Sequence, residues 1–406
     1  MERAERSRAP IQKMADRLAG YLVYFALGAA VLTFSITHNI RSTISVVIVA
    51  GACGIAAGTP LAILGAIGRS ARQGAIIKGG IYLEALGHLD TVFFDKTGTL
   101  TLGAPTVTDV HAAQGDSVEA LIAAAASAER GSEHPLGKAI VSYPSEHGIG
   151  TLQPTNFHYE IGRGISALVE GEPVIAGNRG FLEAAGVVVP NYRDSSGTRV
   201  HVARGGRNAG FISIDDPIRP ASAAAVRALE AMKIRVILLT GDTSSAAMAV
   251  ANQLGIFHLR AGLLPEQKTA EIRERIRRGE VVAMLGDGIN DAPALSEATI
   301  GVAMGAGTDV ARESADVVLI GNDLMKFVET VRIARNCRRV ILENFYGTLI
   351  VDAIGIGLAA AGFLNPLLAA FIHVASELTF IANSTRLLPS RERVKPREVQ
   401  IAASEG

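Results

Sequence analysis

The sequence predicts an α/β protein that is anchored in a membrane by about four helices. Its 406 residues are 49% hydrophobic and only 19% charged, with a mean hydropathy of +0.29, which is too apolar for a purely soluble protein. Long apolar runs lie near both ends of the chain. Between them, short apolar runs alternate with helical stretches, which is typical of a doubly wound parallel sheet. We therefore expect membrane helices on both sides of a soluble α/β part.

Apolar runs predict two membrane hairpins, residues 18–68 and residues 345–388, between a charged lead-in (1–17) and a basic tail (389–406). Their expected spans are Leu18–Ile36, Thr43–Gly68, Thr348–Phe363 and Pro366–Leu388. Basic residues precede the first span and follow the second and fourth, so both ends of each hairpin should lie in the cytosol. The alternative is that these runs are buried core helices.

The second span carries an unusual set of helix-weakening residues. Gly51, Gly54, Gly58 and Pro60 crowd its middle. Because proline removes a backbone hydrogen bond, we expect the helix to kink or unwind near Ala56. Broken helices at membrane depth commonly mark ion sites, although a kink that serves packing alone is the other interpretation.

The soluble part divides into an α/β domain and an insertion. The α/β pattern occupies residues 79–103 and resumes at 211–336, and residues 104–210 interrupt it with their own helices and alternating strands. Polar residues follow three of the expected strands: Asp95, then Thr240-Gly241-Asp242, then Asp287. Since the carboxyl ends of parallel strands meet at one edge of a sheet, these residues should converge.

The converging residues are suited to phosphoryl transfer. The carboxylate of Asp95 could accept a phosphoryl group, although a lone Asp at a strand end is more often a cap or turn residue. Asp95 and Asp287 can share one Mg²⁺, and Lys268 offers an ammonium for the spreading negative charge. Thr240 and the amide of Gly241 can bind phosphoryl oxygens, and Asn290 and Asp291 can orient phosphate and water.

Three segments resemble the core motifs of P-type ATPases: Asp95–Thr99, Thr240–Asp242 and Gly286–Asp291. The resemblance extends from about Arg8 to Leu388 and implies a phosphorylation domain of the haloacid dehalogenase superfamily. It implies that Asp95 is phosphorylated and that Asp95, Thr97 (by its carbonyl) and Asp287 bind Mg²⁺. The catalytic residues that it implies are Asp95, Lys96, Thr97, Thr240, Gly241, Asp242, Lys268, Asn290 and Asp291.

The insertion narrows the resemblance to one subfamily. Ser132-Glu133-His134-Pro135-Leu136 resembles the His-Pro motif of heavy-metal, P1B-type ATPases, in which the Glu and His help to hold the adenine of ATP. The residues that the resemblance assigns to the nucleotide are Glu133, His134, Gly162, Gly164, Gly177 and Asn178. No Walker-type loop occurs, so ATP binding should depend on this pocket.

The resemblance also directs attention to polar residues in the expected spans. Cys53 lies where P1B pumps carry a Cys-Pro-Cys or related motif, but the motif proline and second cysteine are absent, which weakens the case for Cu(I). Asp352, His373 and Glu377 are harder ligands in the later spans. With Cys53 they would make a mixed site for a divalent ion such as Zn, Co, Ni, Fe or Mn. The alternative is that His373 and Glu377 only pair with each other or snorkel.

The resemblance implies ATP-driven export of a transition or heavy metal cation by a multi-pass protein of the bacterial plasma membrane, with its soluble domains in the cytosol. No Thr-Gly-Glu occurs, so we expect the C-terminal part of a pump without its actuator or N-terminal metal-binding domain, which leaves open a separate chain that supplies the actuator. The alternatives are a truncated nucleotide- or metal-binding relic or regulator, a soluble phosphatase of the superfamily and a potassium-pumping relative. The net charge of zero gives no reason to expect nucleic acid as a partner.

Overall fold

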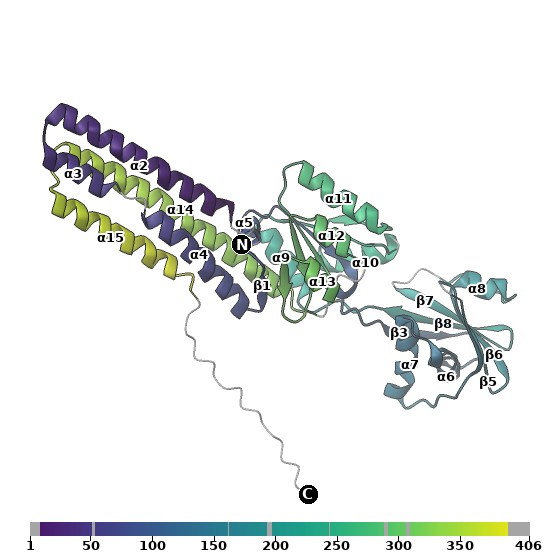
Figure 1. Cartoon of the computed structure of the whole chain (residues 1–406). Helices are drawn as coiled ribbons and strands as arrows, with labels where there is room; N and C mark the ends of the chain where they lie inside the picture. The colour runs from purple at the N-terminus through teal and green to yellow at the C-terminus, as the bar shows by residue number, and fades with distance from the viewer. Residues whose placement is uncertain are drawn as a thin grey trace, which may run out of the picture. The chain divides into compact units, whose positions relative to one another are not determined.

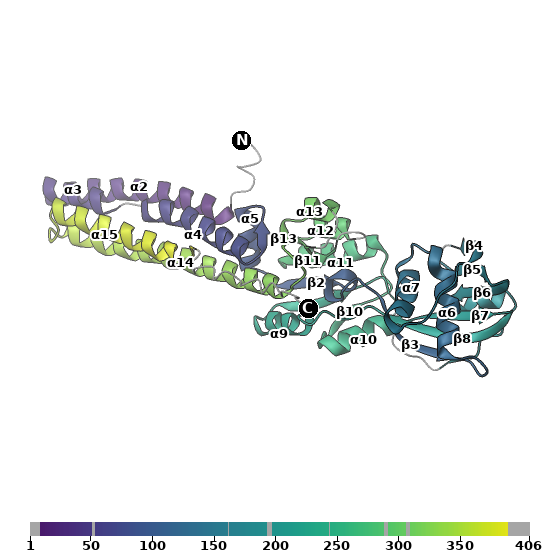
Figure 2. The same ribbon diagram turned by 90° about the horizontal axis from the view of Figure 1, so that it is seen from below.

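The computed structural model describes residues 9–50, 53–160, 162–192, 197–242, 244–287, 291–305 and 309–388. It divides the chain into two compact units. One unit joins the N-terminal 88 residues to the segment from Glu329 onward, and the other comprises Leu89–Val328. Figures 1 and 2 show the elements of each unit in two views.

The first unit is a bundle of long apolar helices that lie side by side (Figure 1). Within the described residues, four helical segments are long and apolar enough to cross a membrane, as the sequence predicts. The elements of this unit are α2 (Pro10–Thr37), α3 (Ile40–Val49), α4 (Cys53–Arg72), β1 (Ala75–Ile77), α5 (Gly80–Gly87), α14 (Met325–Ala360) and α15 (Pro366–Thr385). Asn365 caps α15 by accepting from the Leu368 N–H at 2.8 Å, and Pro366 occupies the first helical turn.

The second span contains two described helices, and neither of them ends near Ala56. Helix α3 ends at Val49, whereas α4 begins at Cys53 and continues through Ala56 and Pro60 without ending. The helix therefore does not unwind near Ala56, so that part of the prediction was wrong. The close packing of α4 explains why: a Cβ on Gly58 would lie 3.3 Å from the side chains of both Asn344 and Ser384. Such contacts with α14 and α15 support the helix at the level of the proline.

The second unit contains a parallel sheet. The strands that this unit contributes to it follow the order β13-β12-β11-β2-β9-β10. Strands β2 and β11 are buried along their whole length, as expected of a sheet covered on both faces. The strands are β2 (Thr91–Asp95), β9 (Arg235–Leu239), β10 (His258–Arg260), β11 (Val282–Gly286), β12 (Ile300–Ala303) and β13 (Val317–Leu319). The helices are α9 (Ser222–Ala231), α10 (Ser244–Leu254), α11 (Pro265–Arg277), α12 (Ala292–Glu297) and α13 (Asp309–Ser314), and a short turn, η1 (Lys96–Leu100), follows β2.

The insertion forms its own antiparallel sheet with the order β3-β8-β7-β6-β5-β4. The strands are β3 (Thr106–Ala112), β4 (Thr155–Glu160), β5 (Gly164–Val169), β6 (Glu172–Gly177), β7 (Thr198–Arg204) and β8 (Arg207–Asp215). The helices are α6 (Val118–Ala128), η2 (Glu129–Gly131), α7 (Pro135–His147) and α8 (Arg179–Ala184). Strand β8 pairs with β3 as far as Asp215, so this sheet extends five residues past the predicted boundary at 210.

Candidate phosphorylation and nucleotide sites

The parallel sheet brings the predicted strand-end residues to one edge. Strand β2 lies between β11 and β9, and both pairings are parallel and in register along the strands. Asp95 is the last residue of β2, while Thr240 and Asp287 directly follow β9 and β11. Three polar side chains from distant parts of the sequence therefore share the carboxyl edge of the sheet, where open α/β sheets bind their ligands.

Asp95 is held in a buried network of charged groups. Its side chain is almost fully buried, at 7% exposure for the residue. The ammonium of Lys268, on α11, donates to Asp95 Oδ1 at 2.6 Å and to Asp291 Oδ1 at 2.8 Å. The backbone N–H of Thr97 donates to Asp95 Oδ2 at 3.0 Å. The carboxylate is thus fixed through both oxygens, as a positioned nucleophile requires.

The electrostatics of this network favour an added cation. Burial is the largest cause that raises the pKa of Asp95 to about 7, and the Asp291 carboxylate raises it further against the opposing effect of Lys268. Burial alone would lower the pKa of Lys268, but the carboxylates of Asp95 and Asp291 reverse this and raise it. Both pKa values are expected to rise where one ammonium is shared by several carboxylates. The Asp287 carboxylate also raises the pKa of Asp95. In the described part of the chain, this cluster has three carboxyl groups, those of Asp95, Asp287 and Asp291, and the ammonium of Lys268.

Asp287 lies against the turn that follows Asp95. A Cβ on Gly98 would lie 2.6 Å from Asp287 Oδ2, and Gly98 has a φ of +70°, so only glycine fits this position without strain. The oxygen ligands and excess negative charge of the cluster fit a hard divalent cation such as Mg²⁺. Residues that would hold it are Asp95 and Asp287, with the carbonyl of Thr97. Asn290, together with residues 288 and 289, lies outside the described residues.

The Thr-Gly-Asp segment is also tied to the turn after Asp95. The side chain of Lys96 forms an ion pair with Asp242. The backbone N–H of Asp242 donates to Thr240 Oγ1 at 3.1 Å. Gly241, between them, is exposed.

Two residues that the sequence analysis did not single out as site residues hold the turn itself. Arg219 is 6% exposed, and its guanidinium donates to the carbonyls of Thr99 (3.0 Å) and Gly98 (2.7 Å). The carboxylate of Asp216 accepts from Thr101 Oγ1 and from the N–H of Gly103 at 2.9 Å. The signal in the sequence was the segment Asp215-Asp216-Pro217, which lies where the chain returns from the insertion to the α/β domain.

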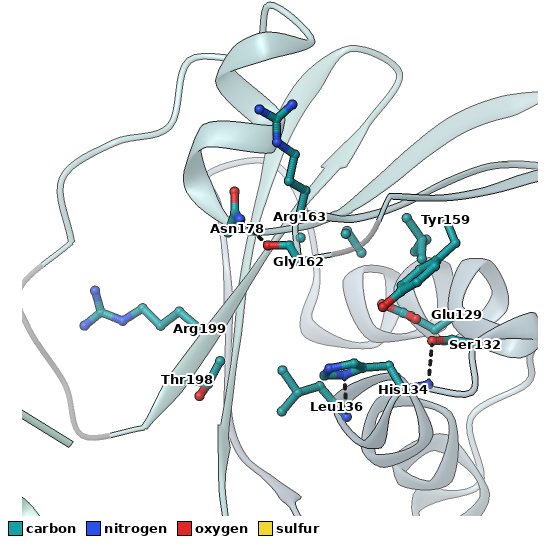
Figure 3. A pocket seen from close by; sticks show the side chains of 15 residues that line it. Glu129, Ser132, His134, Leu136, Tyr159, Gly162, Arg163, Asn178, Thr198 and Arg199 are labelled. Atoms are coloured by element: carbon teal, nitrogen blue, oxygen red, sulfur yellow. Dashed lines mark hydrogen bonds between the residues drawn. The ribbon is translucent and has the colours of Figure 1, made fainter. Parts of the chain in front are cut away.

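The insertion contains a pocket of about 230 Å³. Figure 3 shows its lining side chains, with Asn178 and Gly162 on one side and Glu129, Ser132 and Tyr159 on the other. The predicted residues that line it are His134, Gly162, Gly164, Gly177 and Asn178. Glycine is required where β5 meets β6, because a Cβ on Gly164 would lie 2.2 Å from the carbonyl oxygen of Ala176.

The tautomer of His134 follows from its capping role. His134 caps α7 by accepting from the Leu136 N–H at Nδ1, at 3.2 Å (Figure 3). A neutral imidazole that accepts at Nδ1 carries its proton on Nε2. His134 therefore presents a hydrogen-bond donor to the pocket. Asn178 caps α8 by accepting from the Phe181 N–H at 2.9 Å and donates to the Gly162 carbonyl at 3.0 Å.

The structure places Glu129, not Glu133, in this pocket. Glu133 is exposed and does not line the cavity, whereas Glu129 lines it and is only 6% exposed. Burial raises the pKa of Glu129, and its hydrogen bond with Ser132 opposes this rise. A position next to His134 in sequence is thus not a position beside it in the pocket. The available signal was a single carboxylate directly after the buried alanine-rich helix α6.

Comparisons with known proteins agree with this geometry. Residues 89–299 match the family of haloacid dehalogenase-like hydrolases. The silver exporting P-type ATPase of Salmonella typhimurium is 38% identical over 95% of this chain and 50% of its own length. The manganese-exporting P-type ATPase of Mycobacterium leprae is 39% identical over 96% of this chain and 55% of its own length.

Solved structures give the same relationship. A zinc-transporting PIB-type ATPase in the E2.Pi state has a TM-score of 0.80 and 35% identity, covering 96% of this chain and 66% of that one. A catalytic domain of the CPx-ATPase CopB-B has a TM-score of 0.55 and 30% identity, covering 64% of this chain and 97% of that one. The chain belongs to the P1B-type ATPases. It spans about half the length of the curated relatives it matches.

Among the described members of the mixed metal site that we expected, Asp352 does not join His373 and Glu377 in one cluster. Among the described residues, no three His, Cys, Asp or Glu side chains come together as a metal site. His373 Nε2 lies 3.2 Å from Glu377 Oε1 on α15, as their i, i+4 spacing predicts. Asp352, on α14, is 5% exposed, and its Oδ2 has no hydrogen-bond partner in the described part of the chain. The side chain of Cys53 lies outside the described residues. Sequence spacing could pair residues within one helix but could not fix which faces of separate helices meet.

Proposed function

We propose that this chain carries the catalytic part of an ATP-driven exporter of transition or heavy metal cations, in which Asp95 forms an aspartyl phosphate. The observation that carries the proposal is the buried cluster at the carboxyl edge of the sheet, where one ammonium and a backbone N–H fix both oxygens of a single carboxylate. The P1B-type relatives support the metal cargo, and the pocket with His134 and Glu129 supports ATP as the phosphoryl donor.

The proposed reaction is an in-line transfer. A carboxylate oxygen of Asp95 attacks the γ-phosphorus of ATP, the bond to the bridging oxygen breaks, and ADP leaves with the electron pair. Lys268 stays within hydrogen-bond distance of Asp95 Oδ1 and offsets the charge that develops on the transferred group. Mg²⁺, held by Asp95, Asp287 and the Thr97 carbonyl, would supply further positive charge when bound. Thr240 and the amide of Gly241 lie at the same edge and would orient phosphoryl oxygens, while the carboxylate of Asp242 holds the side chain of Lys96.

The proposed cargo is a divalent transition ion that leaves the cytosol across a bacterial plasma membrane. The relatives are described as exporters of silver, copper or manganese or as transporting zinc, so their descriptions alone do not select one ion. The His373–Glu377 pair and the buried carboxylate of Asp352 offer nitrogen and oxygen ligands, which favour divalent ions over Cu(I).

Labelling with γ-³²P-ATP and Mg²⁺ tests the proposal. The purified chain would be compared with Asp95→Asn and with Asp109→Asn, which removes an exposed carboxylate on β3. We expect an acid-stable, hydroxylamine-sensitive label that Asp95→Asn loses and Asp109→Asn keeps. A panel of divalent metals and Cu(I) would identify the cargo by the ion that changes the label. No label with any metal would contradict the proposal and favour a nucleotide- or metal-binding protein that does not transport.

A further inference from the structure

Tyr159 is an exposed aromatic residue in the wall of the nucleotide pocket. It lies on β4, the edge strand of the antiparallel sheet, opposite the buried Ile165 of β5, which also lines the pocket. The side chain is 43% exposed, and in the described part of the chain its ring stacks on no other ring. Exposed tyrosine rings beside a cavity are suited to binding flat ligands.

The shape of the pocket selects one end of a nucleotide. Its volume of about 230 Å³ is below the range of sites for drug-sized ligands, so it holds part of a nucleotide rather than the whole. Leu136, Ile165 and Ala176 give it apolar walls. A planar base fits such walls, whereas a solvated triphosphate does not.

The charges around the pocket also favour a base, rather than a phosphate, on the side of Tyr159. The buried carboxyl group of Glu129 lies on the same side of the pocket as Tyr159, and its negative form would repel phosphate there (Figure 3). The guanidinium groups of Arg163 and Arg199 point away from that side in the same view. The base therefore enters toward Tyr159 and Glu129, and the phosphates stay away from the carboxyl group of Glu129.

We propose that Tyr159 is the stacking surface for the base of the bound nucleotide. This inference rests on the proposed function, because it takes ATP as the ligand of the pocket. The phenol ring covers one face of the base. Hydrogen bonds at the base edge come from the Nε2–H of His134, which donates to a ring nitrogen, and from Glu129, which accepts from an exocyclic amine. An aromatic ring also tolerates different bases, so Tyr159 supplies affinity while the two polar residues read the base edge.

Equilibrium dialysis with labelled ATP measures the affinity. The full chain would carry Asp95→Asn to prevent turnover and would be compared with the added substitutions Tyr159→Ala, Tyr159→Phe and Phe157→Ala. Phe157 is the matched control, because it lies on the same strand but packs against the turn at Gly131 and does not line the pocket. Base–aromatic stacking predicts that Tyr159→Ala weakens ATP binding about 5- to 150-fold. Tyr159→Phe should stay within about threefold of the parent, since it keeps the ring.

Tyrosine fluorescence gives a second readout that a merely structural role would not change. The chain has seven tyrosines and no tryptophan, so its ultraviolet emission comes from tyrosine alone. A base stacked on Tyr159 should quench the emission of this tyrosine. The total emission should therefore fall by at most the share that Tyr159 contributes. Tyr159→Phe should bind ATP and show no such quenching, while Phe157→Ala should show the parent signal.

The outcomes separate this inference from the proposed function. If the parent protein binds no ATP, the proposed function fails and the inference fails with it. If the parent binds ATP but Tyr159→Ala binds it equally well, stacking is refuted and the proposed function stands. If Tyr159→Phe loses affinity as strongly as Tyr159→Ala, the hydroxyl group rather than the ring carries the contact, which also overturns the inference.

Discussion

Replacing Asp95 with Asn should stabilise the phosphorylation domain in the absence of Mg²⁺, although it removes the proposed nucleophile. The wild-type carboxyl group is buried near Asp291 and Asp287, and its pKa is raised from 3.8 to about 7. A folded-state pKa above the unfolded value means that the folded state binds more protons. Stability therefore falls as pH rises from about 4 through 7 and levels off above that.

The size of the effect follows from the same two pKa values. A rise from 3.8 to about 7 corresponds to about 4 kcal/mol of preference for the protonated carboxyl group. Between pH 5.5 and 8.5, about 2 kcal/mol of this difference should develop. Asparagine carries no charge at any of these pH values, so the variant should lack this dependence. Lys268 loses one anionic partner but keeps Asp291, so we expect a net gain of about 1 to 3 kcal/mol at pH 8.5.

Hydrogen exchange measured by mass spectrometry can follow this change in the detergent-purified chain. The amides of β2 are in the middle of the sheet and exchange only when it opens, so their protection reports the local free energy of opening. The wild type, Asp95→Asn and the exposed-carboxylate control Asp109→Asn would be compared at pH 5.5, 7 and 8.5 with chelator. Equal or lower protection of Asp95→Asn at pH 8.5, or a difference that does not grow with pH, would refute the electrostatic account of the cluster.

Magnesium supplies an internal check on the same cluster. A cation that binds the folded state at 100 times its dissociation constant stabilises by about 2.7 kcal/mol. Mg²⁺ should therefore protect β2 in the wild type most strongly above pH 7, where Asp95 is ionised. Asp95→Asn should lose most of this protection, and an equal response in both proteins would place the cation elsewhere.

Three further predictions concern other contacts. Lys268→Met should reduce the rate of Asp95 labelling by about 100-fold, because a buried charge that offsets the transferred phosphoryl group is lost; a loss below about fivefold would argue against that role. Arg219→Met should slow labelling about tenfold in rapid-quench experiments and leave the dissociation constant of ATP unchanged. The reason is that the hydrogen bonds of Arg219 fix the turn after Asp95 and not the nucleotide. A change in ATP affinity alone would contradict this role. Ser384→Ala removes a buried hydrogen bond to a carbonyl of α4 and should lower the stability of the membrane unit by about 1 to 3 kcal/mol in thermal denaturation, whereas the exposed neighbour Thr385→Ala should not.

The residues at the carboxyl edge of the sheet could be predicted from the sequence, because their positions follow from local strand patterns and from the parallel topology. Each strand appears as a short apolar run, and the polar residue that follows it must lie at the carboxyl edge of a parallel sheet. Asp95, Thr240 and Asp287 needed no further information. Lys268 was predicted from its charge, but its double role as partner of Asp95 and Asp291 was not, because that depends on how α11 is placed over the edge.

The residues that sequence reasoning missed or misplaced share one property: their role depends on a contact between segments far apart in the chain. Arg219 reaches back more than a hundred residues to the carbonyls of the turn after Asp95, and no local spacing encodes such a bond. Glu133 is adjacent to His134 in the sequence, whereas Glu129 lies five residues before it, so sequence proximity favours the wrong one of the two. Helix α6 and the turn η2 decide between them, because they bury Glu129 in the pocket and leave Glu133 in solvent. A buried carboxyl group beside apolar walls can distinguish the edge of a base, whereas an exposed one is screened by water. The difference between the two glutamates is therefore a difference in chemistry as well as in position, and it identifies Glu129 as the residue to test for base recognition.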